Sequence, residues 1–382
     1  MKDDTRAYYS KKKNNLLFVK AGLTFLFLLL MVFSFAIPLR NFITAFTENS
    51  VIVITVYSLL VCLFYVVFTG GVKYYEEFFL KTKLDLSDQS LTEWLRQAAI
   101  DETIFFSIFF VSAQMIYFLM ETHSRWWWLS AAVIWVFFRI IMVKLVPEFI
   151  TPLFARFLPI SDEGLKKRLI FLADSVNIKI DDVYIIKREK NDPQEQTVFV
   201  DPGVKRRIVL GEGVLGYAPE EIEVMAAHEL AHHYYGHVWK KLMIKGLGVV
   251  VIFFLVGVLF GPIARALGYV PVTSVATLPL LAALFFIFSF LAMPVFNMFS
   301  RDMDAEADSF ALQLTKSPDA FVSVMIRISQ QGFVDPNPNR FIEMFLFAEP
   351  SINKRIFMAE DYAQELTFHQ KRNQTLGEGG LL

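Results

Sequence analysis

The sequence predicts a mainly α-helical membrane protein with about six spans and a separate domain that contains a small β-sheet. Hydrophobic residues make up 55% of the 382 residues, charged residues make up 20%, and the mean hydropathy is +0.44. The 40 phenylalanines contribute to more apolar side chain than the core of one water-soluble protein of this size normally hides. Long uncharged runs separated by polar segments give the third indication.

Six of these runs are long enough to cross a bilayer, which needs roughly 20 mostly apolar residues per helix. Only the fourth contains charged residues, Arg139 and Lys144. The first follows a basic stretch, as a signal peptide would, but its length and the lack of a clear cleavage site favour a retained span. The six runs lie at 21–39, 51–72, 103–120, 126–146, 246–264 and 272–300.

Basic residues predict the orientation, because loops rich in Lys and Arg stay on the cytoplasmic side. Residues 1–20 contain six of them and residues 71–100 contain four, whereas the alternate loops hold only Arg40, Arg125 and Arg265. Both chain ends are therefore expected in the cytoplasm. The predicted divisions are a membrane domain at 1–146, a second domain at 147–362 that includes the hairpin at 246–300, and a C-terminal tail at 363–382.

Charge and cysteine content exclude other classes. The net charge of −1 gives no reason to expect nucleic acid as a partner. A single cysteine, Cys62, excludes an intrachain disulfide and a cysteine-rich metal site. The absence of organellar signals favours a prokaryotic plasma membrane over the endoplasmic reticulum.

The second domain mixes helices with short strands. Its pattern predicts a helix over 163–176 and strands at 182–187, 197–200 and 207–210. Another helix is expected to begin near Pro219, at its favoured first-turn position, and to continue through His237. Beyond Ser300 the pattern is helical, with interruptions at prolines.

The helix from Pro219 carries the sequence His228-Glu229-Leu230-Ala231-His232. Residues four apart share a helix face, so the two imidazoles can hold one zinc ion while Glu229 reaches a water beside it. Zinc acidifies water, and a carboxylate that takes its proton makes a nucleophile for a peptide carbonyl. The pattern therefore predicts a zinc-dependent peptidase. His233 and His237 miss the register of the longer three-histidine motif and are expected at the surface or behind the ligands.

A third ligand is expected where the sixth span ends. Asp304 and Asp308 are four residues apart, and Arg301 lies three before Asp304, so the three share one helix face. We predict Asp304 as the ligand and Asp308, with Arg301, as a support that orients an imidazole. Asp302 and Glu306 lie on the other side and are interpreted as a solvated face.

Three stretches, at 228–232, 294–308 and 349–356, together resemble the membrane zinc endopeptidases that include the type 1 CAAX prenyl protease and the HtpX heat-shock protease. Residues 74–95 and 150–154 resemble the CAAX protease branch. The resemblance implies a gluzincin-like zinc protease domain with one zinc held by His228, His232 and Asp304, and Glu229 as general base. It also implies membrane lipids and a polypeptide as partners, the polypeptide lipid-modified or membrane-inserted, with cleavage near the carboxyl end.

The chain departs from that family at several positions. Asp304 stands where the family usually has Glu, and is one methylene shorter. Gln196 precedes the strand where the family has an Asn that positions substrate. Glu349 replaces a His that is thought to stabilise the oxyanion, and an ionised carboxylate there opposes negative charge. The eukaryotic CAAX protease has seven spans, compared with six here.

These residues are compatible with three functions to different degrees. The leading one is an integral-membrane zinc metalloendopeptidase that cleaves membrane-associated or hydrophobic polypeptides. The alternative is a catalytically impaired member that binds substrates or lipids, which the changes at Asp304 and Glu349 favour and the intact Glu229 opposes. A transporter is disfavoured, because the only charges within the spans are two basic residues near one end.

Overall fold

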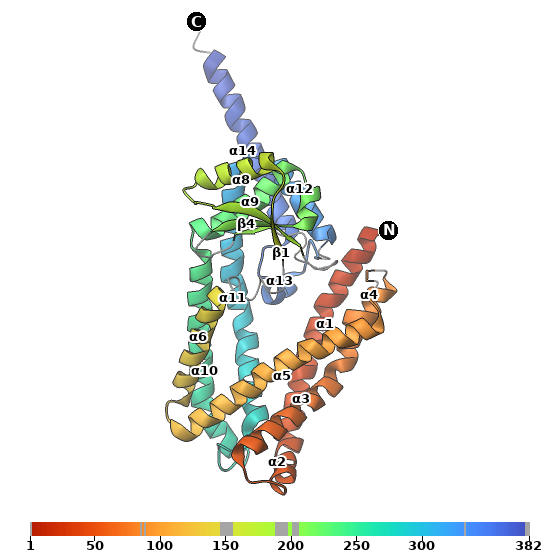
Figure 1. The fold of residues 1–382 in the computed structure, drawn as a ribbon, viewed down its shortest axis with the longest axis vertical. Coiled ribbons are helices and arrows are strands. Elements are labelled where there is room, and N and C mark those ends of the chain that lie inside the picture. Colours follow the sequence, from red (N-terminus) through yellow and green to blue (C-terminus); the bar gives the residue numbers. More distant parts are fainter. Residues whose placement is uncertain are drawn as a thin grey trace. The chain divides into compact units, whose positions relative to one another are not determined.

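The structure is a computed structural model, and it describes residues 2–84, 86–87, 89–145, 156–187, 198–200, 206–331 and 334–378. The chain forms two compact units, each made of two stretches of sequence. Unit 1 comprises Met1–Phe137 and Lys245–Met293, and unit 2 comprises Phe138–Ile244 and Pro294–Leu382. The segment at 245–293 is thus grouped with the first helices in unit 1. Figure 1 shows the elements of both units.

Unit 1 is built from long apolar helices. Among the described residues, five helical stretches are long and apolar enough to cross a membrane: Tyr8–Thr44, Ser50–Lys83, Leu91–Thr122, His237–Ala266 and Val275–Thr315. They contain four of the six predicted spans and most of a fifth, the one predicted at 272–300. The remaining one, predicted at 126–146, is a shorter apolar helix, Trp127–Val143. The helices and the small sheet described below confirm the predicted fold class.

The elements of these stretches are mostly α-helical, with two π-helical turns. The N-terminal stretch contains α1 (Lys2–Leu30), the π-turn η1 (Met31–Phe35) and α2 (Ala36–Thr44). The second contains α3 (Ser50–Tyr74), the π-turn η2 (Tyr75–Phe79) and α4 (Leu80–Lys83). The others are α5 (Leu91–Thr122), α6 (Trp127–Leu145), α10 (His237–Ala266), the short turn η6 (Val275–Thr277) and α11 (Leu278–Thr315).

Polar side chains fix these helices locally. Ser90 and Glu93 form a capping box at the start of α5, which satisfies backbone N–H groups that have no partner within the helix. A π-turn leaves carbonyls out of the regular pattern, and at η1 tyrosine hydroxyls supply donors. Tyr269 donates to the carbonyl of Val32 at 2.5 Å, and Tyr57 donates to that of Ala36 at 3.3 Å.

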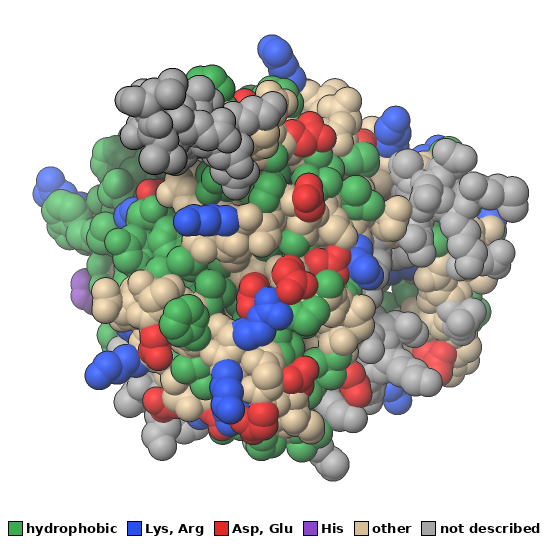
Figure 2. Space-filling model, turned by 90° about the horizontal axis from the view of Figure 1, so that it is seen from above, with side chains coloured by type: hydrophobic (Ala, Val, Ile, Leu, Met, Phe, Trp, Pro, Cys, Tyr) green, Lys and Arg blue, Asp and Glu red, His purple; other side chains and the backbone are tan. Residues whose placement is uncertain are grey.

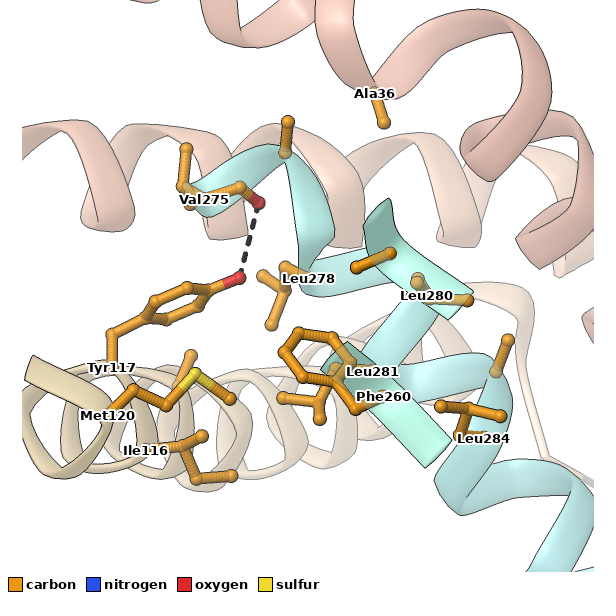
Figure 3. Close-up of a cluster of buried hydrophobic side chains, with 14 of the residues drawn as sticks. Ala36, Ile116, Tyr117, Met120, Phe260, Val275, Leu278, Leu280, Leu281 and Leu284 are labelled. Atoms are coloured by element: carbon orange, nitrogen blue, oxygen red, sulfur yellow. Dashed lines mark hydrogen bonds between the residues drawn. The ribbon is translucent and has the colours of Figure 1, made fainter. Parts of the chain in front are cut away.

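The core of unit 1 is a cluster of buried apolar residues around the turn before α11. Figure 3 shows Tyr117 pointing from α5 toward Val275, with Phe260 of α10 and Leu281 of α11 in the same cluster. The Tyr117 hydroxyl lies 3.4 Å from the carbonyl of Val275 and 2.9 Å from the Thr277 hydroxyl. Gly257 lets α10 approach α6 closely, since a Cβ there would lie 2.5 Å from the Trp128 ring.

Unit 2 contains the sheet. Its strands are β1 (Arg156–Pro159), β2 (Asp182–Lys187), β3 (Val198–Val200) and β4 (Arg207–Gly211), in the order β1-β2-β4-β3. β2 and β4 are parallel, with Asp182 opposite Arg207, and the two outer pairs are antiparallel. The three predicted strands are present, and β1 was not predicted.

Helices cover the sheet of unit 2 and form a second layer. A buried apolar cluster joins α8 (Glu163–Asp174), the sheet and α9 (Pro219–Tyr234), which follows the turn η5 (Glu212–Gly216). Another cluster joins α9 and α11 with α12 (Pro318–Gln331) and α14 (Ile352–Glu378). The short helix α13 (Arg340–Leu346) lies between α12 and α14 in the sequence. The predicted tail at 363–382 is therefore helical as far as Glu378.

Two local features set the ends of α9. At its start, Glu221 accepts a hydrogen bond from the backbone of Ala218 at 2.8 Å and another from Arg327 of α12 at 3.1 Å. At its end, Gly236 has φ +66°, a left-handed conformation that favours glycine. The helix predicted to continue through His237 therefore stops at Tyr234, and α10 begins at His237.

The face in Figure 2 carries Lys and Arg side chains interspersed with Asp and Glu and with apolar residues. This mixture matches the nearly balanced charge of the sequence.

Candidate metal centre

The centre is built on one face of α9. His228 and His232 are four residues apart, their ring centroids are 4.9 Å apart, and the rings are perpendicular. Ligand atoms of His228, Glu229 and His232 all lie within 4.8 Å of one another. The opposite face, which includes Leu230 and Ala226, is fully buried against the sheet. The apolar pattern of α9 thus turns the two imidazoles and Glu229 away from the core.

Asp304 of α11 meets this face. Its Oδ1 lies 3.1 Å from Nε2 of His232. Two ligand atoms each about 2.0–2.1 Å from one zinc ion, at a tetrahedral angle, are separated by roughly 3.3 Å. The observed distance therefore fits two ligands of the same ion. Asp304 is 4% exposed, and Ser300 and Lys241 approach its two oxygens at 3.4 and 3.3 Å.

The remaining ring nitrogens are engaged behind the site. Nδ1 of His228 lies 2.8 Å from Oδ1 of Asp308, and Nδ1 of His232 lies 2.8 Å from Nδ1 of His237. Each histidine is therefore oriented through Nδ1, and Nε2 is left for a metal. Two oriented imidazoles and a carboxylate are a donor set that suits zinc, so the residues present fit the ion.

Proximity alone does not single out Asp304 as the third ligand, because the ligand atoms of Glu229 lie within 4.8 Å of those of both histidines, whereas the contact of Asp304 is with His232. Asp304 is nearly buried and touches Nε2 of His232. Glu229 lines a pocket beside His228. These contacts favour Asp304 as the ligand and leave Glu229 facing the space where a substrate can enter.

Asp308 and Arg355 form a buried ion pair behind His228. Arg355 of α14 donates to Asp308 through Nε at 2.7 Å and Nη2 at 2.6 Å, and neither residue is more than 5% exposed. Burial lowers the pKa of His228, but the hydrogen bond and charge of Asp308 outweigh it and hold that pKa above its ordinary value. Asp308 thus favours a proton on Nδ1, the tautomer that leaves Nε2 free.

Glu229 and Glu349 share the same pocket. Burial raises the pKa of Glu229, the two histidines lower it, and the charges of Asp304 and Glu349 raise it, so that it lies above the ordinary value. A raised pKa suits a general base that works near neutral pH. Glu349 is exposed, and its Oε2 accepts a hydrogen bond from Nη1 of Arg355 at 3.1 Å.

The pocket has a volume of about 270 Å³ and is largely apolar. His228, Glu229 and Arg355 stand at its polar side. Its apolar walls come from α9 and α12 and include Val224, Met225, Phe321, Val324 and Met325.

Several predicted residues occupy other places. Arg301 donates to the backbone carbonyls of Glu343 and Phe347, at 3.1 and 2.8 Å, and so holds the segment around α13. Its position on the Asp304 face of the helix does not bring it to a ligand in any hydrogen bond among the described residues. Gln196 lies outside the described residues.

Glu306 was interpreted as solvated, but its Oε2 lies 3.0 Å from Nε2 of His237, so that interpretation was incomplete. His233 lies 3.0 Å from the carbonyl of Val200 in β3.

Arg355 and Lys241 are the functional candidates that sequence reasoning left without a role. His237, which was expected at the surface or behind the ligands, is buried and contacts His232. Arg355 lies in one of the stretches that carry the family resemblance, which was a signal for it. Gly236 was a signal for a helix break that would redirect His237. Lys241 lies four residues after His237, on the same face of α10, and no sequence signal pointed to it.

The sequence of this chain matches two family profiles and several known proteins. The sequence profile of peptidase family M48 matches residues 159–363, and the profile described as CAAX prenyl protease N-terminal, five membrane helices, matches residues 3–156. YhfN, an uncharacterised metalloprotease of Bacillus subtilis strain 168, is 28% identical over 281 residues, which are 72% of this chain and 66% of YhfN. The human CAAX prenyl protease 1 homolog is 21% identical over 329 residues, covering 74% of this chain and 68% of the relative.

The fold is shared as well. The crystal structure of S. mikatae Ste24p superposes with a TM-score of 0.70 at 15% identity, covering 94% of this chain and 99% of that one. The two sequence profiles confirm the expected family. The chain belongs to peptidase family M48 and is an integral-membrane metalloprotease related to the CAAX prenyl protease.

Proposed function

We propose that this protein is a zinc-dependent endopeptidase that hydrolyses peptide bonds of membrane-associated or hydrophobic polypeptides. The observation that carries the proposal is the convergence of His228, His232 and Asp304 from two helices, with Glu229 beside them at an apolar pocket. Zinc, when bound, would acidify water and polarise the scissile carbonyl.

Glu229 acts as the general base. Its carboxylate lies next to both imidazoles, and its raised pKa lets it accept a proton from the attacking water and pass it to the leaving amine. His228 and His232 would hold the metal, while Asp308 keeps His228 in the tautomer that leaves Nε2 free. The negative charge of Glu349 opposes an oxyanion, but the hydrogen bond from Arg355 offsets part of that charge.

The pocket and the sheet edge support a polypeptide substrate. Val198 of β3 lines the pocket together with His228 and Glu229. Among the described strands, β3 stands at one end of the order, so its other backbone groups can pair with an extended peptide, although the carbonyl of Val200 is engaged by His233. An apolar substrate side chain then fits among the residues of α9 and α12. This arrangement favours hydrophobic sequences at the cleaved bond.

The orientation of the site is also a proposal. The excess of Lys and Arg in residues 1–20 and 71–100 supports a cytoplasmic location for both termini and for the active site. The plasma membrane of a prokaryote is the proposed location, with the endoplasmic reticulum as the alternative. Whether the substrate carries a lipid is tested by comparing peptides with and without one.

A peptidase assay with metal analysis tests the proposal. The purified protein in detergent is given a fluorogenic peptide with apolar residues, and the bound zinc is measured by elemental analysis. Wild type is expected to hold about one zinc per chain and to cleave, whereas Glu229→Gln should keep the metal and lose activity by about 10²- to 10⁴-fold. His228→Gln should lose both.

Asp302→Asn is the matched control, because Asp302 is an exposed acidic residue of α11 with no hydrogen bond to any described residue. It should match wild type. Zinc without cleavage in wild type would favour a binding role, and wild type without zinc would refute the proposal.

A further inference from the structure

The junction between α9 and α10 places a histidine behind the metal centre. Tyr234 ends α9, Gly236 adopts φ +66°, and α10 begins at once with His237. Although His237 opens a helix, it is fully buried, at 0% exposure. A polar ring without solvent needs hydrogen-bond partners on both nitrogens.

His237 has both partners. Its Nδ1 lies 2.8 Å from Nδ1 of His232, and its Nε2 lies 3.0 Å from Oε2 of Glu306 on α11. The His237 side chain is 1% exposed, whereas that of Glu306 is 45% exposed. A chain of hydrogen bonds therefore runs from His232 through a buried ring to a carboxylate at the surface.

The chemistry of imidazole orders the protons in this chain. A neutral imidazole carries one N–H, so a His232 that offers Nε2 to a metal must carry its proton on Nδ1. That N–H can only be donated to His237, whose Nδ1 must then accept. The proton of His237 is consequently on Nε2, from which it is donated to Glu306. Each step is consistent with the next, and an ionised carboxylate at the end favours this order.

We propose that His237 and Glu306 are positioning residues that fix the tautomer and ring orientation of His232 and thereby strengthen metal binding. The inference rests on the proposed zinc site. It gives His232 the same kind of support that Asp308 gives His228, but through an additional ring. Neither residue touches the metal or the substrate.

The first turn of α10 supports the site at a second point. Lys241 is four residues after His237, so the two side chains leave the helix on one face. Nζ of Lys241 lies 3.3 Å from Oδ1 of Asp304. The start of α10 therefore contacts two candidate ligands on different helices, His232 of α9 and Asp304 of α11.

Zinc affinity measured by competition with a chromophoric chelator tests the proposal without relying on activity. His237→Leu removes the acceptor for His232 and should raise the zinc dissociation constant by about 10- to 100-fold. His237→Asn places an amide oxygen near the position of Nδ1 and should recover much of that loss. Glu306→Gln, at an exposed position, should weaken zinc binding by less than His237→Leu does.

Asp302→Asn is the matched control for Glu306→Gln. Both residues are exposed acidic groups two positions from Asp304 on the same helix, but only Glu306 contacts His237. Asp302→Asn should leave zinc affinity unchanged. Equal effects of the two substitutions would mean that only net charge matters, which would overturn the proposal.

The other outcomes separate this inference from the proposed function. If His237→Leu and Glu306→Gln bind zinc as tightly as wild type while His228→Gln does not, the zinc site stands and the positioning role is refuted. If wild type itself binds no zinc, the proposed function fails. Because His237 is buried and its replacement can disturb folding, Glu306→Gln with its matched control decides the case if His237→Leu does not fold.

Discussion

Replacing Arg355 tests whether the buried ion pair of Arg355 and Asp308 is important for the stability of the protein. Arg355 is 5% exposed and Asp308 is 0% exposed, and two hydrogen bonds of 2.6 and 2.7 Å join them. Arg355→Met keeps most of the apolar volume but leaves a carboxylate in the interior with only His228 as partner. Removing one member of a buried pair costs about 3–5 kcal/mol. We expect a loss of stability of that size in metal-free protein.

The measurement is a denaturation series on the detergent-solubilised protein with chelator present. Arg168→Met is the matched control, because Arg168 also bonds two acidic side chains, Glu223 at 2.5 Å and Glu220 at 2.9 Å, but lies at the surface. Its replacement should have a much smaller effect, as is typical of exposed ion pairs. In the double variant Arg355→Met/Asp308→Asn, the loss should be smaller than the sum of the single losses. Equal losses for Arg355→Met and Arg168→Met would refute the reasoning.

Three further outcomes follow from local geometry. Glu349→Gln removes a charge that raises the pKa of Glu229, so the pKa of Glu229 should fall. Because the general base must be ionised, the acid limb of the profile of kcat/KM against pH should move to lower pH. A shift to higher pH would contradict the role of Glu229. Gly236→Ala meets no atom within 4 Å, so its cost, about 1 kcal/mol in the free energy of unfolding, should come from the positive φ alone. Gly257→Ala, in contrast, brings a Cβ to 2.5 Å from the Trp128 ring and should cost about 1–3 kcal/mol through overpacking, visible as a lower midpoint of thermal unfolding.

The membrane helices and the zinc motif were predictable because their signals are local. An uncharged run of sufficient length has few alternatives to a spanning helix. The spacing of His228 and His232 places them on one face of any helix. The strand β1 was missed because four residues that end in Pro159 carry almost no periodic pattern, and its pairing with β2 depends on residues far along the chain.

The supports of the site were harder to predict, because their partners are distant in sequence. Spacing showed that Arg301 shares a face with Asp304, but a helix face is wide enough for one residue to meet α9 and another to meet the carbonyls around α13. Spacing also showed that Glu306 lies away from Asp304, although the start of α10 proved to cover that side. In both cases the residue's position on its own helix was predicted, and the neighbouring helix decided its role.

The two aspartates of α11 illustrate how the same residue type acquires two roles. Asp304 meets His232 and Asp308 meets His228, so the four-residue spacing on α11 matches that on α9 with the chain directions opposed. Asp308 accepts two hydrogen bonds from the buried Arg355. Moving Asp308 away from Arg355 would leave two unpaired charges in the protein interior, which is costly. Asp304 is approached by the Ser300 hydroxyl and by Lys241, whose side chain is 30% exposed and can move its ammonium group into solvent when a dication arrives. Because Lys241 can move away from Asp304 while Arg355 stays bound to Asp308, Asp304 is the carboxylate better able to bind a metal, even though the two side chains are chemically identical.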